Sequence, residues 1–441
     1  MRRWLLLLAI APLGCGDISS EVAISFERPR DDGPLDTVDN ATLSLSPGGF
    51  TEQFAIDGAD ASFEFELPPD DVSRSLSVFF ARGETLVAYG STPPFTFAGA
   101  AGAGVVVFLG YPGTLATLDR DFDLPDASTV LAASPGRGAV ALAADGTAVF
   151  LDAYTFDLVP IAPYPDTVPD ATDGVFVGDD SGSVTRVRFE ASIGAARYVY
   201  GTDSWSTVSD EDMPPRPGAA AWYEPSTARV FVAGGGELTS ILQVEVATED
   251  TTLPTFGELD TNLDGPRVGG ALIGRDTQGV GGLLAFGGDD PSLPLAYAVG
   301  SGEGSGSAGL AWTDARCTTL DGARSLCAGG SIDGTTTAEG ALVDTSAGLE
   351  VTRLPDLLPI PMREVVWLED DAAVYAQGEA RLVRVDRATL EVSEPLGSPQ
   401  RAAGGGAAVL PTGVTLLAGG EAADGSATDV WQLFSPALPG D

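Results

Sequence analysis

Histidine and lysine are both absent from this 441-residue sequence, whose 23 basic residues are all arginine. Without histidine the chain lacks a Ser-His-Asp triad, an imidazole general base and any His-ligated zinc, copper or iron. Without lysine it lacks Schiff-base chemistry and a P-loop lysine. Catalysis would have to rely on carboxylates, tyrosine, arginine or an oxygen-ligated calcium ion, so we expect a protein that is not an enzyme.

Cysteine is also scarce, with three residues. Cys317 and Cys327 lie symmetrically about Gly322, and Asp321-Gly322 is a strong signal for a hairpin turn. The two cysteines would face each other across adjacent antiparallel strands. We therefore predict a cross-strand disulfide in an oxidising compartment, with two buried free thiols as the alternative.

A long apolar run is missing except for the ten residues from Trp4 to Leu13, which follow Met1-Arg2-Arg3. This run is too short to span a bilayer but suits the apolar segment of a secretory signal peptide. It ends in Leu13-Gly14-Cys15, which resembles the lipobox of bacterial lipoproteins. The resemblance implies that residues 1–15 are a lipoprotein signal peptide with Cys15 lipidated, and an ordinary signal peptide is the alternative. Because Gly16 rather than Asp follows the cysteine, we expect anchoring to the outer membrane or cell surface.

Acidic residues outnumber basic ones by 63 to 23, which gives a formal net charge of −40. Such a surface repels phosphate backbones and anionic lipid headgroups. Nucleic acid is therefore not an expected partner, and membrane contact is expected only through the lipid anchor. The same charge favours a soluble monomer.

Residues 19–110 show apolar and polar positions in alternation. Examples are Val22-Ile24-Phe26, Phe63-Phe65-Leu67 and Leu76-Val78-Phe80. Six or seven half-buried antiparallel strands in about 90 residues predict a small β-sandwich, whose simplest role is a spacer.

Residues 112–436 carry a longer repeat, in which an arginine leads a small or apolar strand and a later strand ends at Gly-Gly. The pairs begin at Gly234, Gly287, Gly329 and Gly419, and Gln377-Gly378 replaces one of them. In chain order these positions are 53, 42, 48 and 42 residues apart. A period of this length without helical periodicity predicts an all-β radial repeat of about seven units, with six as the alternative.

These units resemble kelch repeats, the blades of a kelch β-propeller. The family pattern has Gly-Gly closing the second strand of a blade and an aromatic residue before the fourth. The four Gly-Gly pairs match the first feature and Trp431 matches the second. The resemblance covers residues 112–436 and implies a kelch-like propeller that follows the N-terminal β-sandwich.

An arginine precedes the predicted inner strand in most repeats, at Arg137, Arg216, Arg267, Arg363 and Arg401. These five residues are our candidates for a cationic ring at one mouth of the channel, where they would bind anionic ligands such as sialic or uronic acids. The alternative is that each arginine bonds carbonyls and carboxylates of the next blade. One residue per repeat at the same place usually serves the contact between repeats.

A calcium site is a further candidate, because Asp260, Asn262 and Asp264 match the first half of an EF-hand loop. The glutamate expected at position 12 is replaced by Ala271, and no helical pattern flanks the loop. An acidic turn is the alternative. We expect no other cofactor.

The patterns together favour a non-catalytic, lipid-anchored envelope protein. Its propeller would bind or scaffold an envelope or extracellular protein or glycan. One alternative is a propeller glycan hydrolase or lyase that uses carboxylates, tyrosine and arginine. Another is a structural adhesion or surface-coat component.

Overall fold

The computed structural model describes residues 4–7, 23–30, 32–56, 72–96, 105–117, 130–134, 136–143, 145–165, 174–179, 181–246, 253–274, 282–306, 308–394, 401–403, 405–426, 428 and 430–437. Within these residues the structure is all-β, apart from the short 3-10 helices η1 (Gly33–Thr37) and η2 (Tyr200–Thr202). No helix in the described part of the chain has the length and apolar character needed to cross a membrane.

The N-terminal part consists of two sheets packed face to face. One has the order β4 (Phe50–Ala55), β3 (Asn40–Ser46), β5 (Ser75–Arg82), β6 (Thr85–Ser91), and the other β1 (Trp4–Leu7), β2 (Ala23–Glu27), β7 (Val105–Phe108). Alternate residues of both sheets fill one shared core, including Ile24, Leu43, Val78 and Val107, each at most 1% exposed. The period-2 pattern therefore produces the expected β-sandwich, since alternate side chains point to opposite faces of a strand.

Two details differ from the expectation for residues 19–110. β2 and β7 pair in parallel, with Ile24 opposite Val105, whereas the alternation was interpreted as antiparallel throughout. Alternation reports which face is buried and not the direction of the neighbouring strand, so it does not distinguish the two pairings. The predicted strand from Phe63 to Leu67 lies outside the described residues.

In the described residues between Thr114 and Ser435, seven four-stranded antiparallel sheets follow. The first four are β9–β12 (Val130–Ser134, Gly138–Leu142, Ala148–Asp152, Leu158–Pro160), β13–β16 (Val175–Gly178, Val184–Arg188, Ile193–Val199, Ser204–Asp210), β17–β20 (Ala220–Glu224, Arg229–Ala233, Ser240–Glu245, Thr255–Asn262) and β21–β24 (Ala271–Ile273, Leu284–Phe286, Ala296–Ala298, Glu303–Ser305).

The fifth and sixth sheets are β26, β27, β30, β31 (Arg316–Thr319, Arg324–Ala328, Gly340–Asp344, Glu350–Leu354) and β32–β35 (Val366–Glu369, Ala373–Gly378, Arg381–Asp386, Val392–Ser393). A small additional sheet beside the fifth contains β25 (Trp312–Thr313), β28 (Ser331–Ile332) and β29 (Thr335–Thr336). In the last repeat, β36 (Arg401–Ala403) pairs with β39 (Glu421–Ala422).

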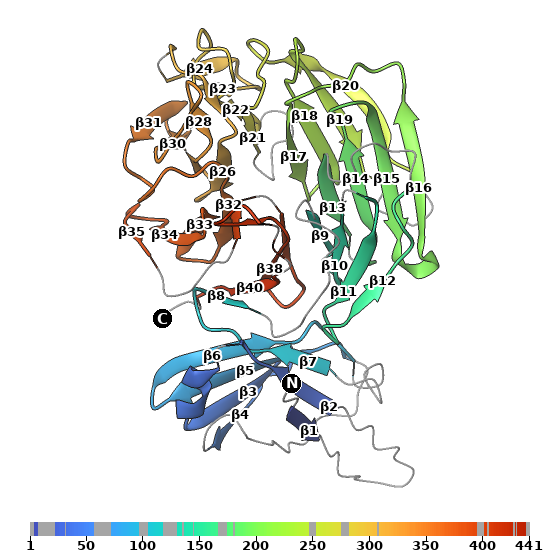
Figure 1. Cartoon of the computed structure of the whole chain (residues 1–441), viewed down its shortest axis with the longest axis vertical. Helices are drawn as coiled ribbons and strands as arrows, with labels where there is room; N and C mark the ends of the chain where they lie inside the picture. The colour runs from blue at the N-terminus through green and yellow to red at the C-terminus, as the bar shows by residue number, and fades with distance from the viewer. Residues whose placement is uncertain are drawn as a thin grey trace.

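The sheets form a ring, as Figure 1 shows above the sandwich. Their first strands lie against one another in the order β37, β9, β13, β17, β21, β26 and β32, while β33 contacts β36 of the last repeat. The first strands are therefore innermost, and the arrangement is a β-propeller.

The ring closes within one sheet. This seventh sheet has the order β37 (Gly406–Val409), β38 (Thr415–Ala418), β40 (Gln432–Ser435), β8 (Thr114–Thr117). Its outermost strand, β8, comes from the opposite end of the propeller region and pairs antiparallel with β40, with Phe434 opposite Leu115. Closure therefore depends on a single sheet that takes strands from both ends of the propeller region.

The sandwich is docked against the seventh and first sheets (Figure 1). Tyr89 donates to the carbonyl of Pro436, Ser91 Oγ donates to the carbonyl of Thr412 at 2.9 Å, and Tyr154 Oη donates to the carbonyl of Pro94 at 2.9 Å. The side chain of Phe108, the last residue of β7, is buried among propeller residues that include Trp431. Polar and apolar contacts together join the two domains.

Candidate functional site

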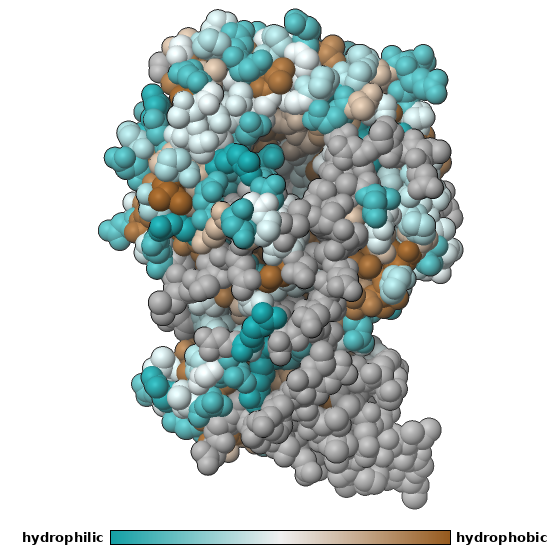
Figure 2. All heavy atoms as spheres, viewed as in Figure 1, coloured by the Kyte–Doolittle hydropathy of each residue, from teal (hydrophilic) through white to brown (hydrophobic). Residues whose placement is uncertain are grey.

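The propeller has two faces because successive antiparallel strands run in opposite directions and their connections alternate between the ends of a sheet. We call distal the face made by the loops that precede first strands and the loops between second and third strands, such as 263–270 and 287–295. We call proximal the face made by the turns after first and third strands, such as 136–137 and 153–157. The sandwich contacts the proximal face, through Thr412 and Tyr154. Figure 2 shows a depression near the middle of the ring with hydrophilic side chains along part of its rim.

Arg267, which precedes β21 at the distal face, is a buried connector, with 3% of its side chain exposed. Its Nη1 donates to the carbonyl of Gly287 at 2.5 Å, its Nη2 donates to that of Pro294 at 2.8 Å, and the guanidinium pairs with Asp264 at 3.0 Å. Its own backbone carbonyl accepts the N–H of Gly235 in the preceding sheet at 3.2 Å. Arg267 therefore holds its own sheet with its side chain and the preceding sheet with its backbone.

Arg216, which precedes β17, also bonds to its own sheet through its side chain. Its side chain is 1% exposed, and its Nη1 donates to the carbonyl of Ser240 at 2.6 Å while its Nη2 donates to Glu258 at 2.7 Å. Burial lowers the pKa of this guanidinium, and the Glu258 carboxylate opposes that shift. The side chains of Arg216 and Arg267 thus bond within their own sheets rather than with the next one, and their structural role explains their position in the repeat.

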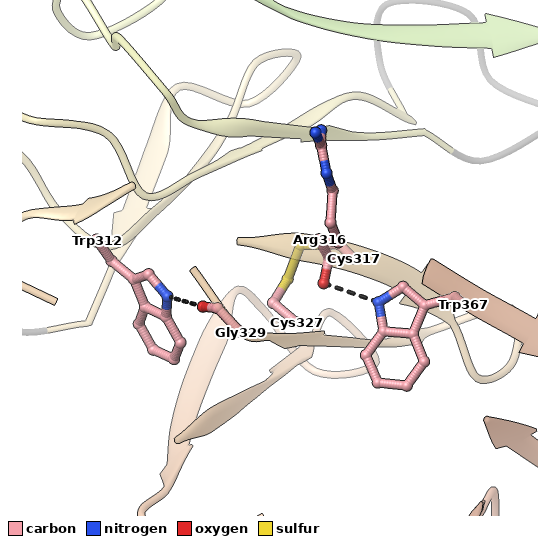
Figure 3. Close-up of a disulfide and its surroundings, with 6 residues drawn as sticks. All are labelled: Trp312, Arg316, Cys317, Cys327, Gly329 and Trp367. Carbon is pink, nitrogen blue, oxygen red and sulfur yellow. Dashed lines mark hydrogen bonds between the residues drawn. A yellow bond between two sulfur atoms is a disulfide. The ribbon is translucent and has the colours of Figure 1, made fainter. Parts of the chain in front are cut away.

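The fifth sheet uses a tryptophan where the preceding sheet uses an arginine. Trp312 is fully buried, its Nε1 donates to the carbonyl of Gly329 at 2.8 Å, and its backbone carbonyl accepts the N–H of Gly288 at 2.7 Å. Arg267 makes the two equivalent bonds one repeat earlier: its side chain donates to the carbonyl of Gly287 and its carbonyl accepts the N–H of Gly235. Figure 3 shows the indole directed at Gly329. In the sixth sheet Met362 takes the position, buried, with its carbonyl accepting the N–H of Gly330 at 3.0 Å.

The Gly-Gly pairs are required by this contact. A Cβ at Gly234 would lie 2.5 Å from the carbonyl oxygen of Arg267, and one at Gly287 would lie 2.3 Å from that of Trp312. Both glycines also have positive φ, +75° and +68°. Only glycine fits both the space and the conformation.

The other candidate arginines differ from Arg216 and Arg267 in position and exposure. Arg363, before β32, has 63% of its side chain exposed and pairs with Glu421 at 3.2 Å. Arg401 begins β36, and its side chain lies outside the described residues. Arg316 was missed by the repeat pattern: it starts the innermost strand β26, is exposed, and extends away from the disulfide in Figure 3.

Arg137 occupies the opposite face. It lies in the turn between β9 and β10, so it follows an innermost strand, whereas the sequence pattern placed it before one. The segment after Arg137 is the second strand of its sheet, and the innermost strand is Val130–Ser134. The structure therefore separates Arg137, on the proximal face, from Arg216, Arg267 and Arg363 on the distal face.

The EF-hand-like segment has a different structure from a calcium loop. Asp260 and Asn262 end the strand β20, and the carboxylate of Asp264 pairs with Arg267. Among the described residues, no three Asp, Glu or Cys side chains are grouped in a way that could hold a metal ion.

The structure contains the predicted disulfide. Cys317 of β26 is paired in register with Cys327 of β27, and their sulfur atoms are bonded. Trp312 and Trp367 flank the bond in Figure 3, the second donating its Nε1–H to the carbonyl of Arg316 at 2.8 Å. The disulfide thus lies within the innermost strand pair of the fifth sheet.

Removing the disulfide should lower the free energy of unfolding, because the unfolded chain gains conformational entropy. We expect the Cys317→Ser, Cys327→Ser double variant to lose about 2–3 kcal/mol, because a loop of roughly ten residues is no longer closed in the unfolded chain. Urea unfolding followed by tryptophan fluorescence measures the loss. Adding a reductant to the wild type should give the same midpoint as the double variant, and a wild type insensitive to reductant under denaturing conditions would contradict the bond.

One pocket of about 200 Å³ lies between the fourth and fifth sheets. Its lining consists of Gly282, Leu284, Ala298, Ser301, Glu303, Thr345, Gly348 and Leu349. These residues belong mainly to strand ends and turns of the proximal face. The pocket has one carboxylate, from the exposed Glu303, and no charged group of opposite sign.

Comparison with known proteins gives likenesses of shape alone. No family model and no curated protein matches the sequence. A chain of a mitotic checkpoint complex is similar at 12% identity and a TM-score of 0.44, over 74% of this chain and 95% of that one. A β-propeller domain from Myceliophteria thermophila is similar at 14% identity and a TM-score of 0.46, over 71% and 98%. A copper-bound fungal alcohol oxidase is similar at 10% identity and a TM-score of 0.35, over 58% and 72%.

Proposed function

We propose that this protein is a lipid-anchored envelope protein whose kelch-like propeller displays its distal face to a protein or glycan partner. The observation that carries the proposal is the position of the sandwich. The sandwich contains the first described strands of the chain, β1 and β2, and contacts the proximal face through Tyr89, Ser91 and Pro94. A chain anchored at its N-terminus would therefore direct the distal loops away from the membrane.

The kelch assignment is supported by the positions of the Gly-Gly pairs. Gly234-Gly235, Gly287-Gly288, Gly329-Gly330 and Gly419-Gly420 each follow the second strand of a sheet, as in the family pattern. The distal loops vary in length from sheet to sheet, and the fifth sheet adds the β28–β29 hairpin there. A rigid ring with variable loops on one face is suited to recognition.

The lipid anchor depends on Cys15, which lies outside the described residues. Cleavage before Cys15 would remove the edge strand β1 and leave the pairing of β2 with β7 in place. We expect the full chain, produced in a bacterial host that processes lipoproteins, to partition into the detergent phase of Triton X-114. The Cys15→Ser variant should partition into the aqueous phase, because it has no thiol to acylate. Cys317→Ser is the matched control and should partition into the detergent phase, as the wild type does. Aqueous partitioning of the wild type would contradict the anchor.

The distal face is tested by crosslinking on the cell surface. Photo-crosslinkers placed at Glu237 and Asp289, in distal loops of the third and fourth sheets, should capture a discrete partner in the native host. A crosslinker at Asp157 on the proximal face is the control. Capture at Asp157 alone would contradict display of the distal face.

A further inference from the structure

We infer that the outer edge of β16, on the rim of the ring, binds an extended, positively charged peptide segment by strand addition. Figure 1 shows β16 as the outermost strand of the second sheet. The inference goes beyond display of the distal face, because it assigns a partner of stated chemistry to the rim. It rests on the open edge of β16, on the protection of the other outer strands and on the charge of the chain.

The strand β16 is paired on one side. Its seven residues pair with those of β15 without a register shift. Within the described residues its backbone makes no hydrogen bond outside that ladder, and Ser204, Ser206, Thr207 and Ser209 are exposed. The second edge of β16 therefore presents a row of backbone donors and acceptors that can pair with one more strand.

The strand is also held in position before any partner binds. The Nε1 of Trp205 donates to the carbonyl of Ala162, just after β12 of the first sheet, at 2.8 Å. The indole packs against Tyr164 and Tyr198, with ring centroids 4.9 Å and 5.3 Å away. Because the edge is already ordered, adding a strand to it costs little conformational entropy on the protein side.

The outer strands of the other propeller sheets are shorter or carry features that hinder pairing. β12 spans three residues and ends in Pro160, while β24 spans three, β35 two and β8 four. β31 carries the exposed Arg353, and β20 has a register shift with β19 and carries Glu258 and Asp260. Short strands, proline, bulges and charged side chains are the usual protection of sheet edges. β16 lacks these features except for Asp210 at its end.

The charge of the chain determines the kind of partner. A net charge of −40 attracts cationic segments and repels anionic ones. Asp210, Glu211 and Asp212 follow one another at the end of β16, and no arginine lies between Arg197 and Arg216. A second copy of this chain would bring the same acidic residues to the contact. The occupant that fits is therefore an extended segment of another protein, rich in lysine or arginine.

Calorimetric titration of the full chain with a nine-residue peptide of alternating lysine and valine tests the inference. We expect saturable binding of this peptide and none of the peptide in which glutamate replaces lysine. A third peptide is the lysine peptide N-methylated at two adjacent central residues, so that neither of its edges can complete a ladder. It keeps the charge but should bind about tenfold more weakly, because backbone hydrogen bonds are lost.

A pair of lysine variants locates the site. Thr207→Lys places a positive charge on the edge of β16 and should weaken binding about three- to fivefold through like-charge repulsion. Thr352→Lys is the matched control, since Thr352 is an exposed threonine of the outer strand β31. It should leave the affinity within about twofold of wild type. In hydrogen exchange, the amides of β16 should gain protection when the peptide is added, and those of β31 should not.

Absence of saturable binding would overturn the inference. Equal affinity for the N-methylated peptide would also overturn it, because charge alone would then attract the peptide. Equal weakening by Thr207→Lys and Thr352→Lys, or protection gained at β20 instead of β16, would place the site elsewhere. Protection of β16 that rises with protein concentration alone would identify a second copy as the occupant and contradict the basic partner. The titration requires neither the lipid anchor nor a distal partner, so failure of the proposed function would leave its result unchanged.

Discussion

Replacing Arg267 with alanine should lower the free energy of unfolding by about 3–5 kcal/mol, the range found when one member of a buried ion pair is removed. The variant leaves the Asp264 carboxylate, 16% exposed, without its cationic partner. It also removes the donors to the carbonyls of Gly287 and Pro294. Urea unfolding followed by fluorescence and by circular dichroism measures the loss as a shift of the midpoint.

Two further variants separate the ion pair from a general effect of lost charge. Arg363→Ala removes an arginine from the equivalent loop of the sixth sheet, but this side chain is 63% exposed, so the change should stay within about 0.5 kcal/mol. The Arg267→Met, Asp264→Asn double variant should recover part of the loss, because no buried charge then remains unpaired. Equal destabilisation by Arg267→Ala and Arg363→Ala would show that burial of the pair is not the cause.

The repeat was predictable from the sequence because the backbone requires glycine at its Gly-Gly pairs. Gly234 and Gly287 approach a neighbouring carbonyl too closely for any Cβ, so the residue type marks the position directly. The disulfide was predictable for a similar reason, since a turn signal and two equidistant cysteines fix the register locally.

The residue that faces each Gly-Gly pair was harder to predict. This position needs a large side chain, and in two sheets one that donates to the carbonyl of the first glycine, a role that arginine and tryptophan both fill. Following arginine alone therefore missed Trp312 and Met362. It also placed Arg137 at the wrong end of its sheet, because the turn after an inner strand and the loop before one both hold a polar residue next to small apolar ones.

Ring closure could not be predicted from local pattern at all. Gln432 and Thr117 are hydrogen-bonded neighbours although 315 positions separate them in the chain. β8 is a strand of only four residues, and its sequence is equally compatible with a last strand of the sandwich. The pairing of β8 with β40 places it in the propeller, and residues of both strands belong to one buried cluster.

The closure predicts a second large effect, at Phe434. This side chain is fully buried, packs on Tyr375 with ring centroids 4.7 Å apart, and shares its cluster with Leu115 of β8. Phe434→Ala should cost about 3–5 kcal/mol, since it leaves a cavity between strands from opposite ends of the propeller region. Val409→Ala, at a side chain that is 56% exposed, is the control and should change stability by about 0.5 kcal/mol or less.

Hydrogen exchange distinguishes loss of closure from uniform weakening. In Phe434→Ala the amides of β8 and β40 should lose protection together, because each strand holds the other in the ladder. The amides of β3 and β5 should keep their protection, since their core is built from sandwich residues. If β3 and β5 opened at the same urea concentration as β8, the sandwich and the closing sheet would form one cooperative unit. The contacts of Tyr89 and Ser91 with the ring would then contribute to closure as strongly as the β8–β40 pairing does.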